Sequence, residues 1–505
     1  MKYLFCLLFI VLPFAIHAQR MSDGIEYMYE SQVSVSNRTT PLWLNANKYG
    51  LSSLDKSNGY LRAMVKRDIS HDDERTVGFG YCLDFALPYN YSTKVAIQQL
   101  YAEVRYKRMT FSLGSKCHPL ELKNQRISSG SQALGINARP VPQLRIALDE
   151  YYTLPFTRGW LSVKGHLSYG YMTDGHWQED FARESMKWTE GALYHSKAGY
   201  LRIGKETQRL SFELGLEMAT VFGGTVHWYD EKQQKQVTFK GGHGLSDFWH
   251  ALVPGGSDFQ EEEKGYVNVE GNMLGSWVAR LSYAHESFSL SLYADHFFED
   301  QSALYHLGTY GYGEDSDWQK RNHKLYLYPL KDGMLGMEVE LKKQDFIRNI
   351  VVEFINTRYQ SGPIYHDHTS SIPDQIGGLD NYYNHQFYPG WHYYGQVMGN
   401  PLYLSPIYND GTLDIKDNRF FAWHLGFLGS ISDRFSYRVL GTWQKGLGTY
   451  RQPYPVAREN VSLMLEASYD IPRVEGLMIK SAFGMDHGKL LGNNNGVQIS
   501  VIYSR

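Results

Sequence analysis

The chain has 505 residues, with 50 basic and 53 acidic side chains and a formal charge of −3. A charge this small and this mixed argues against nucleic acid as a partner, because phosphate backbones are bound by basic surfaces. The mean hydropathy is negative, although aromatic residues make up 15% of the chain. A search for apolar helices would therefore classify the sequence as a soluble protein.

The first residues have the pattern of a secretory signal peptide. Lys2 supplies the positive charge, residues 3–14 form an apolar run, and the pair Ala18 and Gln19 suits cleavage between them. We expect residues 1–18 to be a signal peptide and residues 19–505 to be the mature, exported chain. The alternative is an uncleaved anchor, for which the run is short, since a membrane-spanning helix needs about 20 apolar residues.

From Ile25 onward, short segments alternate apolar and polar residues with a period of two, as strands with one apolar face do. Clear cases are residues 79–87, 212–218, 277–283, 288–294, 337–341, 437–443 and 463–469. We count roughly 16 to 18 such segments, about one per ~27 residues, a spacing typical of barrels with short turns at one end and long loops at the other. A basic residue facing lipid costs about 2–4 kcal/mol at the midplane, so the mid-strand charges are expected to face the lumen.

Two cysteines follow the leader. Cys82 shares a face with Gly80 and Asp84, whereas Cys117 belongs by parity to the opposite kind of face. Export would allow a disulfide, but the parity argues against one. No Cys and His spacing of the zinc-binding type is present, so no metal or other cofactor is predicted.

Four long connections lack clean alternation: residues 120–143, 227–274, 299–330 and 360–418. They are expected to be extracellular loops or segments folded into the lumen as a plug. Residues 361–410 are the richest in rings and amides. Sugars present apolar faces with polar rims, and aromatic side chains beside Asn and His complement such a surface. The candidate polysaccharide-binding residues here are Asn384, His385, Tyr388, Trp391, His392, Tyr393 and Tyr394.

The same residues have other interpretations. The aromatic side chains could pack the loop against the barrel wall, because an ordered long loop must bury apolar area. His366 and His368, with His385 and His392, could bind a metal ion. The sequence has no G-x-S-x-G and no H-E-x-x-H motif, so no catalytic residue is predicted, although the dyads of barrel enzymes are spatial rather than sequential.

The last strand-like segment ends the chain. Val497, Ile499, Val501 and Tyr503 occupy one face of it, and only two residues follow. A half-buried terminal strand is typical of a sheet that closes on itself, and a closed barrel satisfies every backbone group inside lipid. The prediction is an all-β fold, a transmembrane antiparallel β-barrel. A large soluble β protein is the alternative, but it does not explain the terminal strand.

Several motifs resemble the capsule-assembly Wzi family, in its Bacteroidetes-type form. The most specific is Asn-Ala-Arg-Pro-x-Pro at residues 137–142, after the Ser-Gly-rich stretch 127–135. Residues 200–204 with the aromatic-Gly-Gly turn at 222–224 are also similar, as is the loop 384–391 followed by 399–402. The resemblance implies an outer-membrane barrel of about 18 strands that binds capsular polysaccharide as a lectin. A helical N-terminal segment found in enterobacterial members is not expected here.

Asn137 and Arg139 of this motif are added to the candidate binding residues. Arg139 could pair with an acidic sugar, or with Glu213 or Glu217 of the wall. The leading hypothesis is a monomeric, non-enzymatic outer-membrane protein that binds and anchors surface polysaccharide and contacts outer-membrane lipid. A porin or oligosaccharide channel is the first alternative, and an outer-membrane enzyme acting on lipid or glycan is the second.

Overall fold

The computed structural model describes residues 23–205, 207–230, 234–253, 271–299, 332–360 and 380–505, and the backbone of four further short strands. The expected signal peptide and its cleavage site lie outside the described residues. The pair His366 and His368, on which the alternative metal site depends, also falls outside the side chains that are described.

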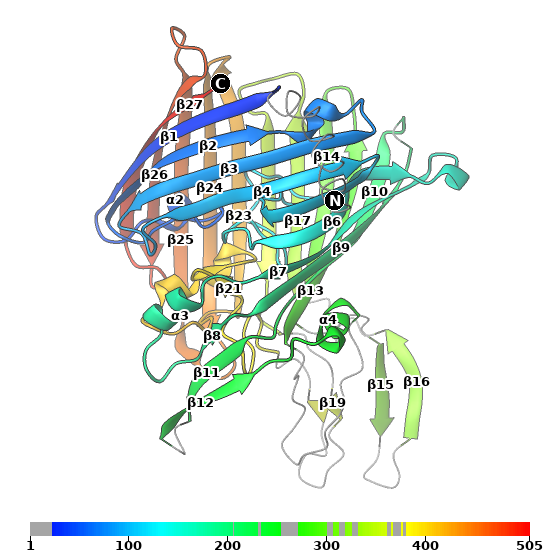
Figure 1. Ribbon diagram of the computed structural model, residues 1–505, viewed down its shortest axis with the longest axis vertical. Helices are drawn as coiled ribbons and strands as arrows, with labels where there is room; N and C mark the ends of the chain where they lie inside the picture. Colours follow the sequence, from blue (N-terminus) through cyan, green and yellow to red (C-terminus); the bar gives the residue numbers. More distant parts are fainter. Residues whose placement is uncertain are drawn as a thin grey trace, which may run out of the picture.

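Eighteen antiparallel strands form one closed barrel (Figure 1). Each strand pairs with its neighbours along the chain, and the first pairs with the last. The strands are β1 (Ile25–Ser36), β2 (Ser57–Arg67), β3 (Val77–Tyr89), β4 (Ala96–Tyr106), β5 (Met109–Ser115), β6 (Gln143–Thr153), β7 (Leu161–Tyr171), β9 (Leu193–Ile203), β10 (Leu210–Phe222), β13 (Asn272–Ala284), β14 (Phe288–Phe298), β17 (Gly333–Leu341), β18 (Asn349–Asn356), β23 (Phe420–Ser432), β24 (Phe435–Gly448), β25 (Pro453–Asp470), β26 (Leu477–Gly488) and β27 (Asn494–Ser504).

The terminal strand closes the barrel, as the sequence predicted. β27 pairs with β1 from Met28 opposite Ser504 to Ser36 opposite Gly496, and with β26 on its other side. Val501 is 43% exposed on the outer face, whereas Ser500 is 4% exposed and faces the lumen. No edge is left at this seam, which removes the row of unpaired backbone groups that an open sheet would present to lipid.

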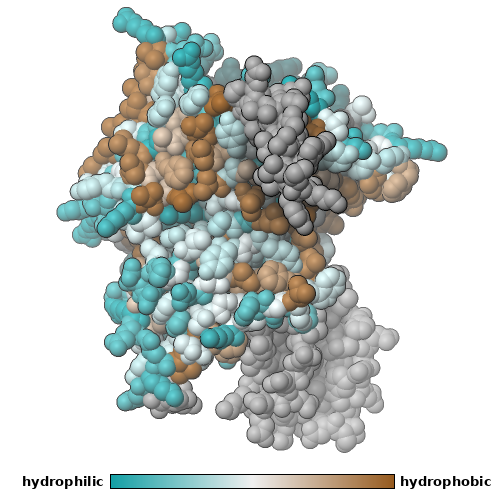
Figure 2. Space-filling model, in the orientation of Figure 1, coloured by the Kyte–Doolittle hydropathy of each residue, from teal (hydrophilic) through white to brown (hydrophobic). Residues whose placement is uncertain are grey.

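The two faces of the wall differ in polarity. Outward residues such as Leu61, Leu292 and Ile499 are exposed, and Figure 2 shows brown, apolar side chains over much of the visible wall. Charged side chains of the strands face the lumen, as predicted, and several of them form ion pairs there. The inward ion pairs join Arg62 to Glu30 and Asp84, Arg280 to Glu338, and Arg438 to Glu466.

The described helices are all short. None of them combines the length and apolar character that a membrane-spanning helix needs. They are α2 (Leu42–Asn45), α3 (Gly175–Phe181), α4 (Leu245–Leu252) and the 3₁₀ turns Ile69–Asp72, Pro155–Thr157, Pro401–Tyr403 and Pro406–Tyr408.

The two ends of the barrel have connections of different length. At one end, where β1 begins and β27 ends, turns such as 107–108 and 433–434 are tight. At the other end lie the long connections 37–56, 116–142, 172–192, 223–271, 299–332 and 357–419. Barrels of the outer-membrane type have short periplasmic turns and long extracellular loops, so we expect the long-loop end to face the cell exterior. The connections 37–56 and 172–192 were missing from the sequence prediction.

The long loops contain small sheets of their own. β8 (Trp188–Glu190), β11 (Thr225–Asp230) and β12 (Lys235–Lys240) form a three-stranded sheet. Three two-stranded pairs are β15 (Leu307–Tyr312) with β16 (Gln319–Leu325), β19 (Tyr365–His366) with β20 (Gln375–Ile376), and β21 (His392–Tyr393) with β22 (Gln396–Val397). The two described cysteines are free, Cys82 on the lumen side of β3 and Cys117 in the loop after β5, in agreement with the parity argument.

We predict that charge on the outer face of β27 prevents closure. In the variant Val501→Asp/Tyr503→Asp, two carboxylates point away from the lumen, where lipid cannot solvate them, and the seam with β1 should fail to form. The measurement is heat-modifiable mobility on a denaturing gel, with loss of the folded band expected.

Ser500→Asp is the matched control for this variant. Ser500 faces the lumen opposite Lys480, so a carboxylate there has a cationic neighbour and should leave the folded band in place. Equal loss of the folded band in both variants would contradict the assignment of the two faces.

Candidate functional site

Three of the long connections fold inward and fill the lumen near the long-loop end. They are residues 37–56 with α2, residues 116–142, and residues 380–419, here called the plug. The main hydrophobic core of the molecule lies here rather than in the wall, and its largest buried rings include Trp43, Tyr382, Tyr383, Trp391 and Tyr403. The sequence predicted that residues 120–143 and 360–418 are either extracellular loops or segments folded into the lumen. The described parts of both segments fill the lumen.

Carboxylates of the wall hold the central strip of the plug, residues 128–132. Glu353 accepts hydrogen bonds from the Ser128 hydroxyl (2.6 Å) and the Ser129 amide (2.8 Å). Asp295 accepts from the Gln132 amide (3.0 Å), and Glu217 accepts from the Ser131 hydroxyl (3.1 Å). All three carboxylates are almost completely buried.

The charge of these carboxylates is partly balanced from within the plug. Lys123 lies 2.7 Å from Asp295, and both side chains are buried. Its pKa is raised despite burial, because the carboxylates of Asp295, Glu217 and Glu353 stabilise the ammonium form. Because a buried backbone group without a partner is costly, this arrangement fixes where residues 128–132 can lie.

Aromatic hydroxyls join the strip to the segment 380–419. Tyr383 and Tyr403 stack at 4.0 Å between ring centroids, and both donate to Gln132, one to its backbone carbonyl and the other to its side chain (3.0 Å). The two segments also cross at Gly135 and Gly399, where a Cβ added to either residue would overlap the other segment. The Gly135 amide donates to the Met398 carbonyl (2.9 Å). The crossing therefore requires two residues without side chains.

The segment 37–56 is bound in the same way. The Trp43 indole donates to Thr442 (3.1 Å), and the Leu42 amide donates to Asp486 of β26 (3.1 Å). His424, on the neighbouring wall, bridges Thr442 and the Ile127 carbonyl. The inserted turn was not visible in the sequence, although its short apolar run of residues 42–44 is the signal that could have indicated it.

The aromatic patch proposed for sugar stacking lies inside the plug. Trp391 is 1% exposed, and its ring lies 6.2 Å from that of Tyr194 on the wall. Tyr388 and Tyr393 are similarly buried. The Tyr388 hydroxyl donates to the Gly223 carbonyl, and the Tyr393 hydroxyl shares a hydrogen bond with the Thr173 hydroxyl. These rings offer no free face in this conformation, as the packing interpretation expected. Sugar stacking on them stays a prediction.

The histidines and the asparagine of the same segment are also enclosed. Asn384 is 7% exposed and binds the backbone of Ile415 through both its amide nitrogen (2.9 Å) and oxygen (2.7 Å). Burial lowers the pKa of His385 and of His392 to about 3. His392 approaches Asp174 to 3.9 Å, but with a neutral ring this contact is not an ion pair at neutral pH.

Asn137 connects all three plug segments. Its side chain accepts from the Asn47 amide (3.0 Å) and donates to Gln396 and to the Val397 carbonyl. Arg139 donates to Thr93 (2.8 Å), and its guanidinium lies 4.5 Å from the centre of the Tyr394 ring. Tyr394 is half-buried. Burial lowers the pKa of Arg139.

The expected alternative partners of Arg139 are engaged elsewhere. Glu217 is bound by Tyr200 (2.8 Å) and Ser131, and among the described residues no carboxylate pairs with Arg139. Arg139 lines a cavity of about 110 Å³ together with Lys116 and Arg145, which are paired with Glu103 and Asp149. The cavity is smaller than the roughly 300–1,000 Å³ of ordinary ligand pockets, so it suits a small anionic group rather than a polymer.

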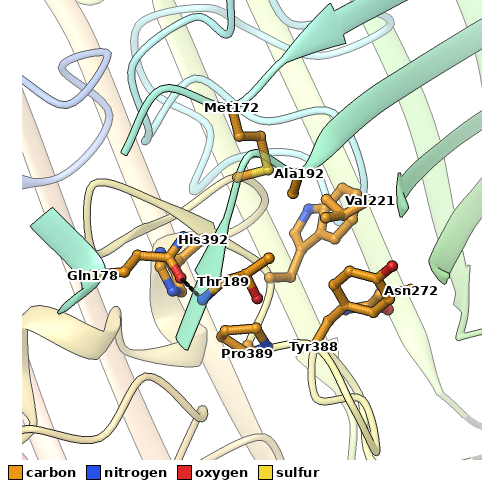
Figure 3. Close-up of a pocket in the computed structure, with 11 residues that line it drawn as sticks. Met172, Gln178, Thr189, Ala192, Val221, Asn272, Tyr388, Pro389 and His392 are labelled. Carbon is orange, nitrogen blue, oxygen red and sulfur yellow. Dashed lines mark hydrogen bonds between the residues drawn. The ribbon is translucent and has the colours of Figure 1, made fainter. Parts of the chain in front are cut away.

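A second cavity lies beneath the aromatic patch (Figure 3). It measures about 20 Å³ and is lined by Thr189, Asn272, Tyr388, Trp391 and His392 among others. A volume of this order holds about one water molecule. Neither of these two cavities can enclose a sugar chain. A larger hollow of about 550 Å³, lined by Trp443, Glu459 and His487 among others, is an open groove rather than an enclosed cavity. A polysaccharide is therefore expected to bind on the outer surface.

That surface carries rings that the sequence did not single out. In the sheet of β8, β11 and β12, Trp188 and His227 stack at 4.0 Å with 7° between their planes, and both are half-buried. Trp228 and Phe239 lie on the other face and pack towards the plug through Phe387. Because β8 lies in the unpredicted connection 172–192, only the tertiary structure brings Trp188 to His227. No group of His, Cys, Asp and Glu suited to a metal ion is found among the described residues.

No protein-family model matches the sequence, and no curated protein matches it either. Solved structures do resemble it in fold. Wzi from Escherichia coli, described as a carbohydrate-binding β-barrel and outer-membrane protein of group 1 capsule assembly, aligns over 97% of this chain and 86% of its own, with a TM-score of 0.55 and 12% identity. The outer membrane protein OprD from Pseudomonas aeruginosa aligns over 95% and 92%, with a TM-score of 0.44 and 9% identity. At these identities the likeness concerns the fold.

We predict that the wall carboxylates stabilise the plug. The Glu353 carboxylate accepts hydrogen bonds from Ser128, Ser129 and Tyr293. In Glu353→Gln, the amide NH₂ group replaces one of the two accepting oxygens and faces donors, so that hydrogen bonds are lost. The free energy of unfolding should fall by about 1–3 kcal/mol, and brief conductance events should appear in planar bilayers.

Glu30→Gln is the matched control, since the side-chain partners of Glu30 among the described residues are Tyr60 and Arg62, both of the wall. It should give no conductance events. Similar events in both variants would mean that the carboxylate bonds to residues 128–132 do not hold the plug.

Proposed function

We propose that this protein is an outer-membrane barrel of Gram-negative cells that binds and retains a polysaccharide at the cell surface, as a Wzi-like member of a capsule-assembly system. Residues 1–18 would direct export and be removed, and the mature barrel would act as a monomer without a cofactor. The single observation that supports binding over transport is the plug, which fills the lumen with loops tied to the wall by buried carboxylates.

The site that we propose for the polymer is the exposed side of the loop sheet rather than the buried patch. Trp188 and His227 form a half-buried stacked pair on the long-loop side of the barrel. An aromatic ring offers large area at low entropy cost, and stacking contacts contribute about 0.5–1.5 kcal/mol beyond burial. Arg139 and its cavity are a second point of contact, suited to the carboxylate of an acidic sugar that reaches between the loops.

A diffusion channel is the alternative, because porins share the barrel architecture. It requires an open or opening lumen. The purified protein in planar bilayers should therefore show little or no stable conductance. Steady, porin-like steps of current in the unmodified protein would favour the channel over the binding protein.

We predict that Trp188→Ala weakens polysaccharide binding without weakening the fold. The loss of one stacking ring should raise the dissociation constant for the producing cell's own purified polysaccharide about threefold to tenfold, corresponding to about 0.5–1.5 kcal/mol. The measurement is titration of the detergent-solubilised barrel, with the midpoint of unfolding recorded for the same sample.

Trp391→Ala is the comparison variant. Its ring is in the plug core, so its removal should cost about 3–5 kcal/mol of stability, as deletion of a buried aromatic side chain does. Unchanged affinity in Trp188→Ala, together with a selective loss of affinity in Trp391→Ala at unchanged stability, would move the binding site to the patch at residues 384–394.

A further inference from the structure

The helix α4 lies on the outer side of the barrel wall. On β9, Ala198 and Tyr200 face the lumen and are buried, so Lys197 and Leu201 face outward. The Lys197 ammonium donates to the carbonyls of Ala251 (3.0 Å) and Leu252 at the C-terminal end of α4. The helix is therefore attached to the face of the wall that elsewhere is apolar and exposed.

Two aromatic contacts fix the helix on this face. Tyr169 of β7 also points outward and donates through its hydroxyl to the Phe248 carbonyl (2.7 Å). The Phe248 ring packs against Tyr169 at 5.1 Å and against Phe222 of β10 at 5.4 Å. Beneath this contact, the outward-facing His195 is fully buried, with its ring 4.5 Å from that of Tyr169.

Lys197 is a cation on the outer face of the wall and needs hydrogen-bond acceptors there, which the end of α4 supplies. An ammonium group on the outer face would be costly in contact with lipid, by about 2–4 kcal/mol at the midplane and less near the interface. The C-terminal end of a helix carries unpaired carbonyls and partial negative charge. The helix therefore satisfies a cation that the membrane would otherwise have to solvate.

The side-chain pattern of α4 shows which surroundings it fits. At 100° per residue, its apolar side chains cover a continuous arc of about 200°. Phe248, Ala251 and Leu252 take up the half that faces the wall. Leu245 (90% exposed), Trp249 (59%) and the following Val253 (42%) form the other half, which we call the outer stripe. The polar sector holds Ser246, Asp247 and His250.

The outer stripe is continuous with the lipid-facing surface of the barrel. α4 covers the long-loop ends of β7, β9 and β10, where the wall meets the extracellular side. Outward tryptophans near the corresponding ends of other strands, Trp277, Trp423 and Trp443, are placed as in the aromatic belt of a membrane interface. In Figure 1, α4 is drawn at the lower border of the wall, where the strands give way to the loops.

We propose that α4 is an interfacial helix whose outer stripe inserts into the boundary between head groups and acyl chains of the outer leaflet. Its partner is lipid, which contacts Leu245, Trp249 and Val253, while the polar sector faces water. The helix would thereby set the depth of the barrel and hold the adjoining loop sheet close to the membrane surface. This inference rests on the proposed membrane location, but it does not depend on polysaccharide binding.

Collision accessibility of a nitroxide label tests the proposal in the full-length protein reconstituted into phosphatidylcholine vesicles. Single cysteines are introduced by Trp249→Cys, Val253→Cys and Ser246→Cys in a Cys117→Ser background, leaving the buried Cys82. Oxygen concentrates in hydrocarbon, whereas a neutral nickel chelate stays in water. The ratio of oxygen to nickel collisions should be raised at positions 249 and 253 and low at 246.

A label at Leu292→Cys distinguishes failure of the interfacial helix from failure of the membrane location. Leu292 is an outward residue in the middle of β14 and is 50% exposed, so it should be oxygen-accessible whenever the barrel spans the bilayer. High oxygen access at 292 with nickel access at 249 and 253 would overturn the interfacial helix alone. Nickel access at all four positions would overturn the membrane location, and labels at 249 and 253 closed to both reagents would mean that protein covers the stripe.

Discussion

The structure depends on the need to satisfy polar groups inside a closed barrel. A loop that enters the lumen takes its amides and carbonyls away from water, and each one needs a partner. Here the wall supplies acceptors in the form of the buried carboxylates of Glu353, Asp295 and Glu217, which bind residues 128–132. The buried carboxylates would themselves be unfavourable without these donors and without Lys123. Plug and wall therefore stabilise each other: without the plug the carboxylates would lose their donors, and without the carboxylates the amides of the plug would lose their acceptors.

The aromatic side chains extend this principle to the rest of the plug. Tyr383 and Tyr403 pack like core residues but end in hydroxyls, and both hydroxyls are used on Gln132. Rings of this type fill a wide lumen with few residues, and these two also pair their own hydroxyl donors. A lumen filled in this way is suited to holding a surface rigid, whereas passage of a solute would require the network to break. The proposed binding function rests on this network.

Polar groups are also paired on the outer surface of the wall, near its long-loop end. The wall there departs from the apolar pattern at Lys197 and His195. Carbonyls of α4 accept from Lys197, and the ring of Tyr169, whose hydroxyl binds α4 at Phe248, packs on His195. The loop sheet of β8, β11 and β12, with Trp188 and His227, lies in the same group of long-loop connections. The long connections thus have three roles: they fill the lumen, carry the stacked pair Trp188 and His227, and cover the long-loop edge of the wall.

The wall of the barrel could be predicted from the amino-acid sequence. Alternation with a period of two records which side chains face lipid and which face the lumen, so the barrel, its inward charges, the separated cysteines and the closing strand at residues 494–504 could all be predicted. The long inward segments at 120–143 and 360–418 were also visible, because they lack that alternation. The insertion at 37–56 and the connection at 172–192 were missed, since each is short and interrupts the pattern only briefly.

The positions of individual loop side chains could not be predicted from the sequence. In residues 384–394, the same rings and amides suit either a sugar or a protein core, and no local pattern distinguishes the two. The structure places Trp391 in the core because Tyr194 and the lumen surround it, and it brings Trp188 next to His227 from separate loops. Likewise, α4 has apolar residues over more than half its circumference, and its sequence does not say which half meets protein. Local periodicity fixes the face of a strand, but the partners of a loop are fixed by contacts between residues far apart in the chain.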